Sequence, residues 1–358
     1  MQPVLLIQEF YMQTLLQTPG NFATTEQGEQ LFFSGYSYLG MASHAAFMQW
    51  VKEGLDKYGL MQPSARISNT PLKIYSEAEA QISDWLAAAD TVLFAGGFAA
   101  GQAAVHSIQE LNCPIFAAPN CHPAVLAAGI QSATTSFETW SQHVVEQINN
   151  HTYEGPYAII ADAVNPLAPV AYDWQFLSAI QKPLLVLIDD SHGIGITGNN
   201  GKGIASLLPQ KENIEWMISF SMSKALGVQA GAVACSNAST AAALRSNPFY
   251  AATTPPMPAV LHAWQQANKL YEAQRAKLQQ HYNWIKEQMQ QTPSFVLHPQ
   301  LPILFLPTEM NEHWFAQHNI LISSFAYPNP AGKPLNRAVF SAAHSQQDVQ
   351  QLIAVLRA

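Results

Sequence analysis

The sequence predicts an α/β fold, with a mostly parallel sheet in a large domain followed by a smaller α+β domain. Short apolar runs alternate with helical patterns from about residue 45 to residue 256, as expected for parallel strands covered by helices on both faces. After Pro255-Pro256 the pattern changes to a long helix, separate strands and a last helix. We therefore expect an N-terminal segment at residues 1–44, a large domain at 45–256 and a small C-terminal domain at 257–358.

Local patterns place the first elements of the chain. Apolar residues at helical spacing predict an amphipathic helix at Leu5–Gln17, and a short apolar run predicts a strand at Leu31–Phe33. A Ser-Glu-Ala-Glu pattern of the capping-box type predicts a helix at Ser76–Ala89. Two further helices are expected at Phe98–Glu110 and Ala124–Ser132.

Six short apolar runs in the large domain are typical of strands buried in a parallel sheet. They are Thr91–Phe94, Pro114–Ala117, Ala158–Asp162, Leu184–Asp189, Trp216–Phe220 and Gly231–Cys235. Helical segments fit between most of these runs, which is the pattern of right-handed strand–helix–strand units.

The last third of the chain has a different order of elements. A long helix is expected at Ala259–Gln290, followed by strands at Ile303–Leu306, Ile320–Phe325 and Arg337–Ala342. A final helix opens at Ser345, with an acidic residue three positions later. Strands and helices in this order predict a small α+β domain.

Composition excludes several classes of function. Of the 358 residues 48% are hydrophobic and 11% are charged, and the formal net charge is −8 with no basic run, so nucleic acid is not an expected partner. The odd set of Cys113, Cys121 and Cys235 has no metal-ligand spacing, so we expect reduced thiols and no metal. No apolar stretch is long enough to span a membrane and no signal-peptide pattern is visible. We therefore expect a cytoplasmic protein, and the low charge density suggests an oligomer.

The pairing of a strand-end acid with a later lysine indicates the chemistry. The apolar run before Asp189 ends in Asp-Asp-Ser-His, and Lys224 lies in a turn rich in serine and glycine. Pyridoxal 5'-phosphate requires a lysine that forms a Schiff base with its aldehyde and an acid that pairs with its pyridine nitrogen. A solvent-exposed loop lysine and a turn-forming aspartate are the ordinary alternatives for the two residues. Together, and in this order, they favour the cofactor.

Other candidate residues have structural alternatives of equal weight. The glycines of residues 96–101 free backbone N–H groups at a helix start, where a phosphate binds, or they form a tight turn. His122 is placed either to stack on a flat ring or to cap the following helix, and His192 is either a cofactor ligand or a structural histidine. Gly193 to Gly198 matches the dinucleotide motif by letter, but the residues before it separate it from the strand, so we reject that site.

Taken together, these motifs resemble the α-oxoamine synthases, a family of fold-type I pyridoxal-phosphate enzymes. The resemblance runs from about residue 31 to the end of the chain. Its landmarks are Tyr-Leu-Gly at 38–40, Ser-Ala-Arg-Ile-Ser at 64–68, Gly-Phe-Ala-Ala at 97–100, His122, Asp-Asp-Ser-His-Gly-Ile-Gly at 189–195, Ser-Lys-Ala-Leu-Gly at 223–227, Pro-Pro at 255–256, and the segment from Arg337 to His344.

The resemblance implies roles around the cofactor ring. Lys224 would carry the cofactor, and Asp189 would meet the pyridine nitrogen. His192 would hydrogen-bond the ring hydroxyl, while His122 would stack on the ring face. These four residues are the expected catalytic group, with no metal.

The resemblance also implies the remaining contacts and partners. Gly97, Phe98 and Ser221 would hold the phosphate, and Arg337 would hold the carboxylate of the substrate. Ser37 stands where the family has an asparagine and would be the second residue near that carboxylate. Family members are homodimers with sites at the subunit interface, and they condense an amino acid with acyl-CoA or acyl carrier protein. Among these reactions we favour alanine with a medium-chain acyl group, as in the biotin pathway.

Several departures from the family pattern lie around the substrate rather than the cofactor. Asn69 replaces a glycine, and Ala251-Ala252 replaces the Ser-Thr before Pro-Pro, with Thr253 and Thr254 following as possible phosphate contacts. Near Asp162 the segment lacks the hydroxyl that would assist His192. An aminotransferase or aldolase-like enzyme of the same fold, and a pyridoxal-phosphate-binding protein without turnover, therefore remain as alternatives.

Overall fold

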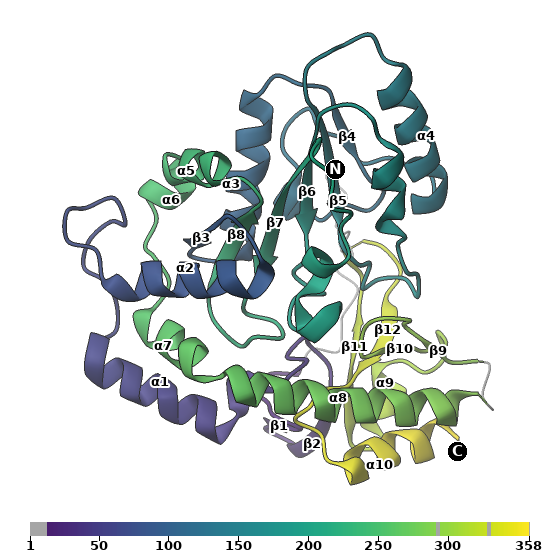
Figure 1. Cartoon of the computed structure of the whole chain (residues 1–358). Helices are drawn as coiled ribbons and strands as arrows, with labels where there is room; N and C mark the ends of the chain where they lie inside the picture. The colour runs from purple at the N-terminus through teal and green to yellow at the C-terminus, as the bar shows by residue number, and fades with distance from the viewer. Residues whose placement is uncertain (1–12, 291–293, 328–330, 358) are drawn as a thin grey trace, which may run out of the picture.

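The computed structural model describes residues 13–290, 294–327 and 331–357. Two six-stranded sheets organise this part of the chain (Figure 1). The first sheet has the order β3-β8-β7-β6-β5-β4, and the second has the order β1-β2-β11-β12-β10-β9. The prediction of an α/β fold with a mostly parallel sheet is confirmed.

The strands of the first sheet agree closely with the predicted apolar runs. They are β3 (Asp90–Phe94), β4 (Ile115–Ala117), β5 (Tyr157–Asp162), β6 (Leu184–Asp189), β7 (Ile214–Ser221) and β8 (Gly231–Cys235). Strands β4 to β7 pair in parallel, and β8 runs antiparallel to both of its neighbours. Every residue of β6 is buried, which explains the continuous apolar sequence of this strand.

The second sheet combines the two ends of the chain. An N-terminal hairpin of β1 (Phe22–Thr25) and β2 (Gly28–Phe33) joins β9 (Val296–Leu297), β10 (Ile303–Phe305), β11 (Ile320–Phe325) and β12 (Leu335–Val339). Strand β2 pairs in parallel with β11, and the other neighbours in this sheet pair antiparallel. Figure 1 shows the hairpin beside the C-terminal elements, although most of the chain separates them.

Helices cover both sheets and connect them. The α-helices are α1 (Ala45–Tyr58), α2 (Lys73–Leu86), α3 (Gly97–Glu110), α4 (Phe137–Asn150), α5 (Ala238–Arg245), α6 (Pro248–Ala251), α7 (Pro258–Gln266), α8 (Asn268–Met289), α9 (Glu312–Ala316) and α10 (Gln346–Leu356). Helix α1 packs against α7, and α8 extends from α7 past the second sheet (Figure 1). Among the described residues, no helix has both the length and the apolar composition of a membrane span.

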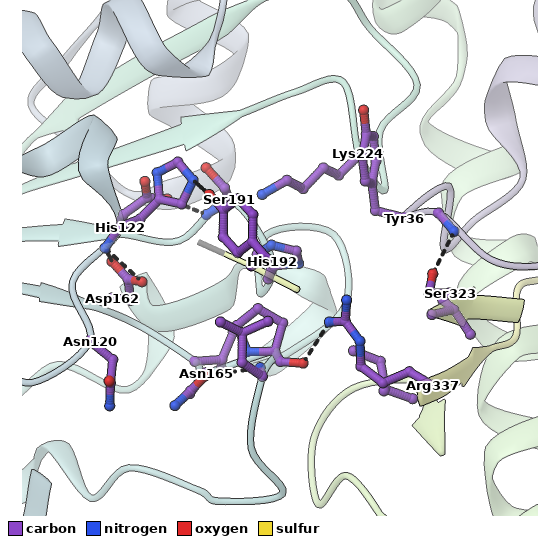
Figure 2. Close-up of a pocket in the computed structure, with 18 of the residues that line it drawn as sticks. Tyr36, Asn120, His122, Asp162, Asn165, Ser191, His192, Lys224, Ser323 and Arg337 are labelled. Carbon is purple, nitrogen blue, oxygen red and sulfur yellow. Dashed lines mark hydrogen bonds between the residues drawn. The ribbon is translucent and has the colours of Figure 1, made fainter. Parts of the chain in front are cut away.

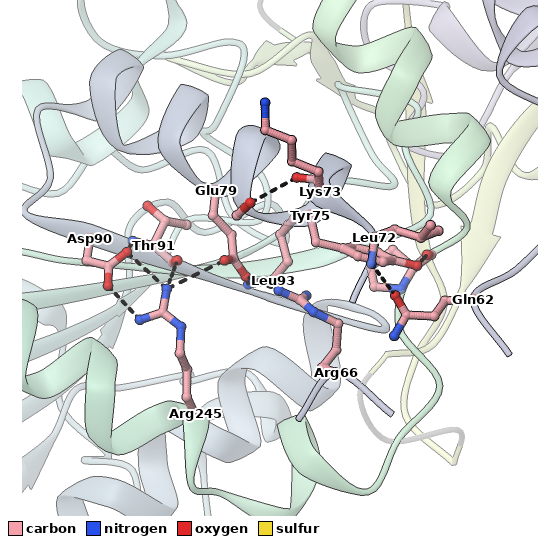
Figure 3. A network of polar contacts seen from close by, with 12 residues as sticks. Gln62, Arg66, Leu72, Lys73, Tyr75, Glu79, Asp90, Thr91, Leu93 and Arg245 are labelled. Atoms are coloured by element: carbon pink, nitrogen blue, oxygen red, sulfur yellow. Dashed lines mark hydrogen bonds and ion pairs between the residues drawn. The ribbon is translucent and has the colours of Figure 1, made fainter. Parts of the chain in front are cut away.

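A network of ion pairs around Glu79 of α2 connects this helix to β3, to α5 and to the loop before α2 (Figure 3). Arg66 Nη2 lies 2.8 Å from Glu79 Oε1, and that oxygen also accepts a hydrogen bond from Leu93 N at 2.9 Å. Arg245 lies 2.6 Å from Asp90 and 3.5 Å from the other Glu79 oxygen. Because buried charges are tolerated only when they are paired and hydrogen-bonded, this network is structural.

Three predicted helices differ from the structure. Helix α2 begins at Lys73 and not at Ser76, because the carboxylate of Glu79 contacts Arg66 instead of closing a capping box. The helix expected at Ala124–Ser132 is wrong: only Pro123–Val125 form a 3₁₀ turn, after which Leu126 is extended. The long helix expected at Ala259–Gln290 is divided at Ala267, where ψ is 5°.

The predictions for the first and the last helix of the chain differ in their outcome. Residues 5–12 of the helix expected at Leu5–Gln17 lie outside the described residues, and residues 13–17 are not helical. The capping box of the last helix is confirmed, because the Ser345 side chain accepts a hydrogen bond from Asp348 N and the Asp348 side chain accepts one from Ser345 N.

Candidate active site

A cavity of about 440 Å³ opens where the carboxyl ends of β5 and β6 face the second sheet. Its walls come from both sheets, with Asp189, His192 and Lys224 on one side and Ser323 and Arg337 on the other. Figure 2 shows Lys224 and Arg337 reaching into the same space, with His192 between them. Ligands of open α/β sheets bind at this edge, so the cavity is the natural candidate for an active site.

Asp189 and Asp162 are held side by side by the register of the sheet. They are Cα partners at the ends of β6 and β5. Asp189 Oδ1 accepts a hydrogen bond from Ser191 N at 2.9 Å, and both oxygens of Asp162 accept from His122 N, at 3.1 and 3.2 Å. Burial, and then the charge of Asp189, raise the pKa of Asp162 well above its usual value. Burial and the neighbouring charge therefore favour the protonated form of Asp162.

Lys224 lies in the turn that follows β7. Gly227 has φ 66° in this turn, and a Cβ there would lie 2.6 Å from Met41 Cβ, so the turn requires glycine. Burial lowers the pKa of Lys224, while Asp189 and Asp162 act in the opposite direction. A lysine with a lowered pKa supplies a neutral amine more readily than a surface lysine does.

His122 caps the short turn that follows it, and its ring also contacts Tyr327. Its Nδ1 accepts a hydrogen bond from Ala124 N at 3.1 Å, which caps the 3₁₀ turn. Its Nε2 lies 2.6 Å from Tyr327 Oη, and the two rings stack with an interplanar angle of 22°. Burial lowers the pKa of His122, so the imidazole is neutral with its proton on Nε2. Stacking on a cofactor ring stays a prediction.

His192 lines the cavity behind Asp189. Its Nδ1 lies 2.8 Å from the hydroxyl oxygen of Tyr38. Burial lowers the pKa of His192 well below its usual value, and the positive charge of Lys224 adds to that effect. The imidazole is therefore neutral, and Nδ1 is the nitrogen that contacts Tyr38.

The predicted phosphate ligands lie beside this cavity and not in its lining. Gly97 begins α3, and a Cβ on it would lie 2.5 Å from Ser221 Cβ, so the helix start and the end of β7 approach closely. No side chain caps this helix, and its N–H groups are placed as an anion site requires. Phe98 is 59% exposed. Ser221 N donates a hydrogen bond to the hydroxyl of Ser191, which does line the cavity.

Arg337 is a buried arginine and not a surface residue. It lies on β12, is 7% exposed, and its Nη1 donates a hydrogen bond to Pro166 O at 3.1 Å. Burial lowers its pKa. Its Nε is buried without a hydrogen-bond partner among the described residues, so the guanidinium can accept an anionic ligand. Ser37 does not line the cavity, although both of its sequence neighbours do.

Four residues that sequence reasoning did not assign to the site also shape it. Tyr38 and Tyr327 contact the two histidines through their hydroxyls. His298 Nε2 lies 3.0 Å from Asn165 O. This contact holds the loop in which Pro166 accepts the hydrogen bond from Arg337. Only Tyr38 had a local signal, because it begins the Tyr-Leu-Gly landmark. Tyr327 and Asn165 line the cavity, whereas His298 lies outside the lining and contacts Asn165 through a bond between distant segments.

The donor set fits pyridoxal 5'-phosphate. The cavity offers an amine with a lowered pKa, an aspartate at a strand end, two neutral imidazoles and a buried guanidinium with an unpaired Nε. An uncapped helix start lies beside Ser221 for the phosphate. No group of three or more potential metal ligands occurs among the described residues.

Known proteins with similar sequences cover nearly the whole chain. No family model matches it. The 8-amino-7-oxononanoate synthase of Vibrio cholerae is 26% identical over 347 residues, covering 91% of this chain and 87% of the relative. The same enzyme of an Enterobacter species is 26% identical over 368 residues, covering 95% and 92%. By these likenesses the chain is similar to members of the α-oxoamine synthase family.

Solved structures show that the family fold is present. A serine palmitoyltransferase from S. paucimobilis with bound PLP superposes with a TM-score of 0.82 at 17% identity, covering 97% of this chain and 92% of that one. The 8-amino-7-oxononanoate synthase from Francisella tularensis gives a TM-score of 0.72 at 20% identity, covering 91% and 96%. The chain therefore has the fold-type I architecture of these transferases. The likeness to the curated synthases indicates that it is an enzyme.

Proposed function

We propose that this enzyme condenses a small amino acid with an acyl thioester, with loss of carbon dioxide, to give an α-amino ketone. The observation that carries the proposal is the convergence of Lys224, Asp189 and Arg337 on one cavity that spans both sheets. Alanine and a medium-chain acyl group, carried by CoA or acyl carrier protein, are the substrates we favour. The curated relatives support this choice, because they are named 8-amino-7-oxononanoate synthases.

Pyridoxal 5'-phosphate, when bound, supplies an electron sink for negative charge at the substrate Cα. Lys224 would hold the cofactor through its amine and, once displaced by the substrate, remove the Cα proton. Its lowered pKa suits both tasks, because a general base works best when its pKa is near the operating pH. Asp189 would keep the proton on the pyridine nitrogen, beside Asp162, whose pKa is raised by burial and by the charge of Asp189.

Arg337 would orient the amino acid by its carboxylate. Nη1 is already used by Pro166 O, so the free Nε and the remaining N–H groups are the donors available to the substrate. This contact would hold the amino acid in the cavity that Lys224 and His122 also line. His122 is neutral, so it adds no charge that would compete with Arg337 for the carboxylate.

The proposed reaction balances without an oxidant. A carbon–carbon bond forms between the Cα and the acyl carbonyl carbon, and the carbon–sulfur bond of the thioester breaks to release the thiol. The amino-acid carboxyl group leaves as carbon dioxide, and a proton returns to the Cα. Lys224 lines the cavity in which these atoms would react and would make both proton transfers.

Thiol release tests the proposal directly. Alanine, glycine and serine are each incubated with acyl-CoAs of short to long chain, and free CoA and carbon dioxide are measured. We expect equal amounts of the two products with at least one pair, and no product from Lys224→Ala. Conversion of the cofactor to its amine form by amino acid alone, with no thiol released from any acyl-CoA, would identify an aminotransferase. No product of either kind would identify a binding protein.

Borohydride reduction provides the structural control for that assay. Reduction should fix a pyridoxyl group on Lys224, and peptide mapping should find none on Lys202, which lies outside this cavity. A label on another lysine would contradict the proposed role of Lys224 even if thiol release were observed.

We also propose that the enzyme acts as a homodimer. Leu60, Met61 and Ile67 are 58%, 54% and 65% exposed, and all three lie in the loop between α1 and α2. Large apolar side chains gathered on one exposed loop are typical of a surface that a partner covers. The exposed Phe98 at the phosphate site supports the same proposal.

A further inference from the structure

Among the described residues, the hydroxyl of Tyr38 is the side-chain group that hydrogen-bonds a ring nitrogen of His192. The Tyr38 ring is 1% exposed, and its oxygen lies 2.8 Å from His192 Nδ1. Backbone bonds fix the tyrosine on the side of the second sheet, because Ala342 N donates to Tyr38 O at 2.9 Å. His192 belongs to the loop after β6 in the first sheet, so the contact joins the two halves of the cavity.

The direction of this hydrogen bond follows from burial. If His192 Nδ1 carried the proton, Tyr38 would accept, and the phenolic proton would have no partner among the described residues. A buried donor without an acceptor is costly, whereas a hydroxyl oxygen tolerates an unused lone pair. Tyr38 therefore donates, Nδ1 accepts, and the proton of the neutral imidazole is on Nε2.

We infer that Tyr38 is a positioning residue that fixes His192 in the Nε2–H tautomer, so that the imidazole presents a hydrogen-bond donor to the cavity. The chain lacks a hydroxyl near Asp162 of the kind that the family resemblance would place beside this histidine. The Tyr38 hydroxyl instead hydrogen-bonds His192 at Nδ1, the ring nitrogen that does not carry the proton. The role of His192 towards the cofactor rests on the proposed function, but the tautomer does not.

Nitrogen NMR of the full-length protein tests the tautomer. Histidine is labelled with ¹⁵N, and the His192 signals are assigned by their loss in His192→Gln. We expect the Nε2–H tautomer in the wild type and a loss of that single tautomer in Tyr38→Phe. The matched control is Tyr75→Phe, since Tyr75 is also 1% exposed and its hydroxyl donates one hydrogen bond, to Pro256 O at 2.9 Å.

The outcomes of this experiment are distinct. An Nδ1–H tautomer in the wild type would overturn the inference whether or not the variant folds. An unchanged tautomer in a folded Tyr38→Phe would overturn it as well. A change in Tyr38→Phe with none in Tyr75→Phe supports it.

A spectral titration separates this inference from the proposed function. In protein loaded with pyridoxal 5'-phosphate, loss of one hydrogen bond to the cofactor oxygen should move the titration of the visible band to higher pH by about 0.7 of a unit in Tyr38→Phe. Tyr75→Phe should leave the titration in place. If the tautomer changes and the band does not move, the inference about Tyr38 stands, and the proposed contact between His192 and the cofactor is refuted.

Discussion

Asp189 and Asp162 show how two identical side chains at one sheet edge acquire different chemistry. Both end buried strands, yet Asp162 receives two contacts from a single backbone N–H and lies in the field of Asp189. Burial and the charge of Asp189 raise the pKa of Asp162, and these effects outweigh the His122 N–H contacts, which lower it. The proposed partner of a cofactor nitrogen is Asp189.

Substitution by asparagine should distinguish these two acids. Asp189→Asn should retain pyridoxal 5'-phosphate but exchange the α-proton of a bound amino acid roughly 100-fold more slowly, about 2.7 kcal/mol in barrier. Asp162→Asn changes a group whose raised pKa favours the neutral form, so its loss should stay below about tenfold. Exchange into deuterated water, followed by mass spectrometry, measures both. Equal losses in the two variants would show that the acids share the charge.

At the scale of one element, the loop between β6 and β7 is built around the buried carboxyl group of Asp190. Its Oδ2 accepts a hydrogen bond from Ile204 N at 2.8 Å, and a Cβ on Gly193 would lie 2.1 Å from its Oδ1. Gly195 and Gly198 have φ values of 82° and 68° in the same loop. The letters of a dinucleotide motif therefore arise here from turns packed around a carboxyl group, and they do not open an α-helix after the strand.

This loop should make stability depend on pH. Burial raises the pKa of Asp190 from 3.8 to about 8. The unfolded chain ionises first, so the contribution of Asp190 is fully present below pH 3.8 and is lost as the pH rises to about 8, at about 1.4 kcal/mol per unit. Urea unfolding from pH 4 to pH 9 should show Asp190→Asn gaining stability relative to the wild type across this window. A pH-independent difference would contradict the raised pKa.

At the scale of the whole molecule, the cavity exists because the two sheets meet. Lys224 and Asp189 come from the first sheet, while Arg337 and its neighbours come from the second. Tyr38 and Tyr327 cross the boundary to reach a histidine on the other side. Any change in the relative position of the two sheets would separate these pairs.

Association of subunits is the property we expect at this scale. Sedimentation should give a dimer, and Ile67→Glu should weaken the association at least tenfold, because it places a charge on an apolar surface that a partner would bury. Leu111→Glu is the control, since Leu111 is 49% exposed at the opposite end of α3 from Phe98. A monomer at all concentrations, or equal effects of the two variants, would reject the proposed dimer surface.

The sequence alone determined the strands of the first sheet and the two residues on which the chemistry was inferred. The continuous apolar runs predicted the bounds of β6 and β8 as the structure has them. Asp189 was identified because it is the last residue of β6. Such local patterns are readable because a strand buried on both faces must be apolar throughout. The missing hydroxyl near Asp162 was also visible in the sequence, but the contact between Tyr38 and His192 was not.

Only the tertiary structure decided the contacts between distant segments. The parallel pairing of β2 with β11, the bond from Tyr38 to His192 and the stacking of Tyr327 on His122 all join residues far apart in the chain. The wrong helix after Pro123 has the same origin, because His122 caps a short turn that is held against Asp162. Periodicity records which face of an element is buried, but not which partner buries it, and that choice is made by packing the whole chain.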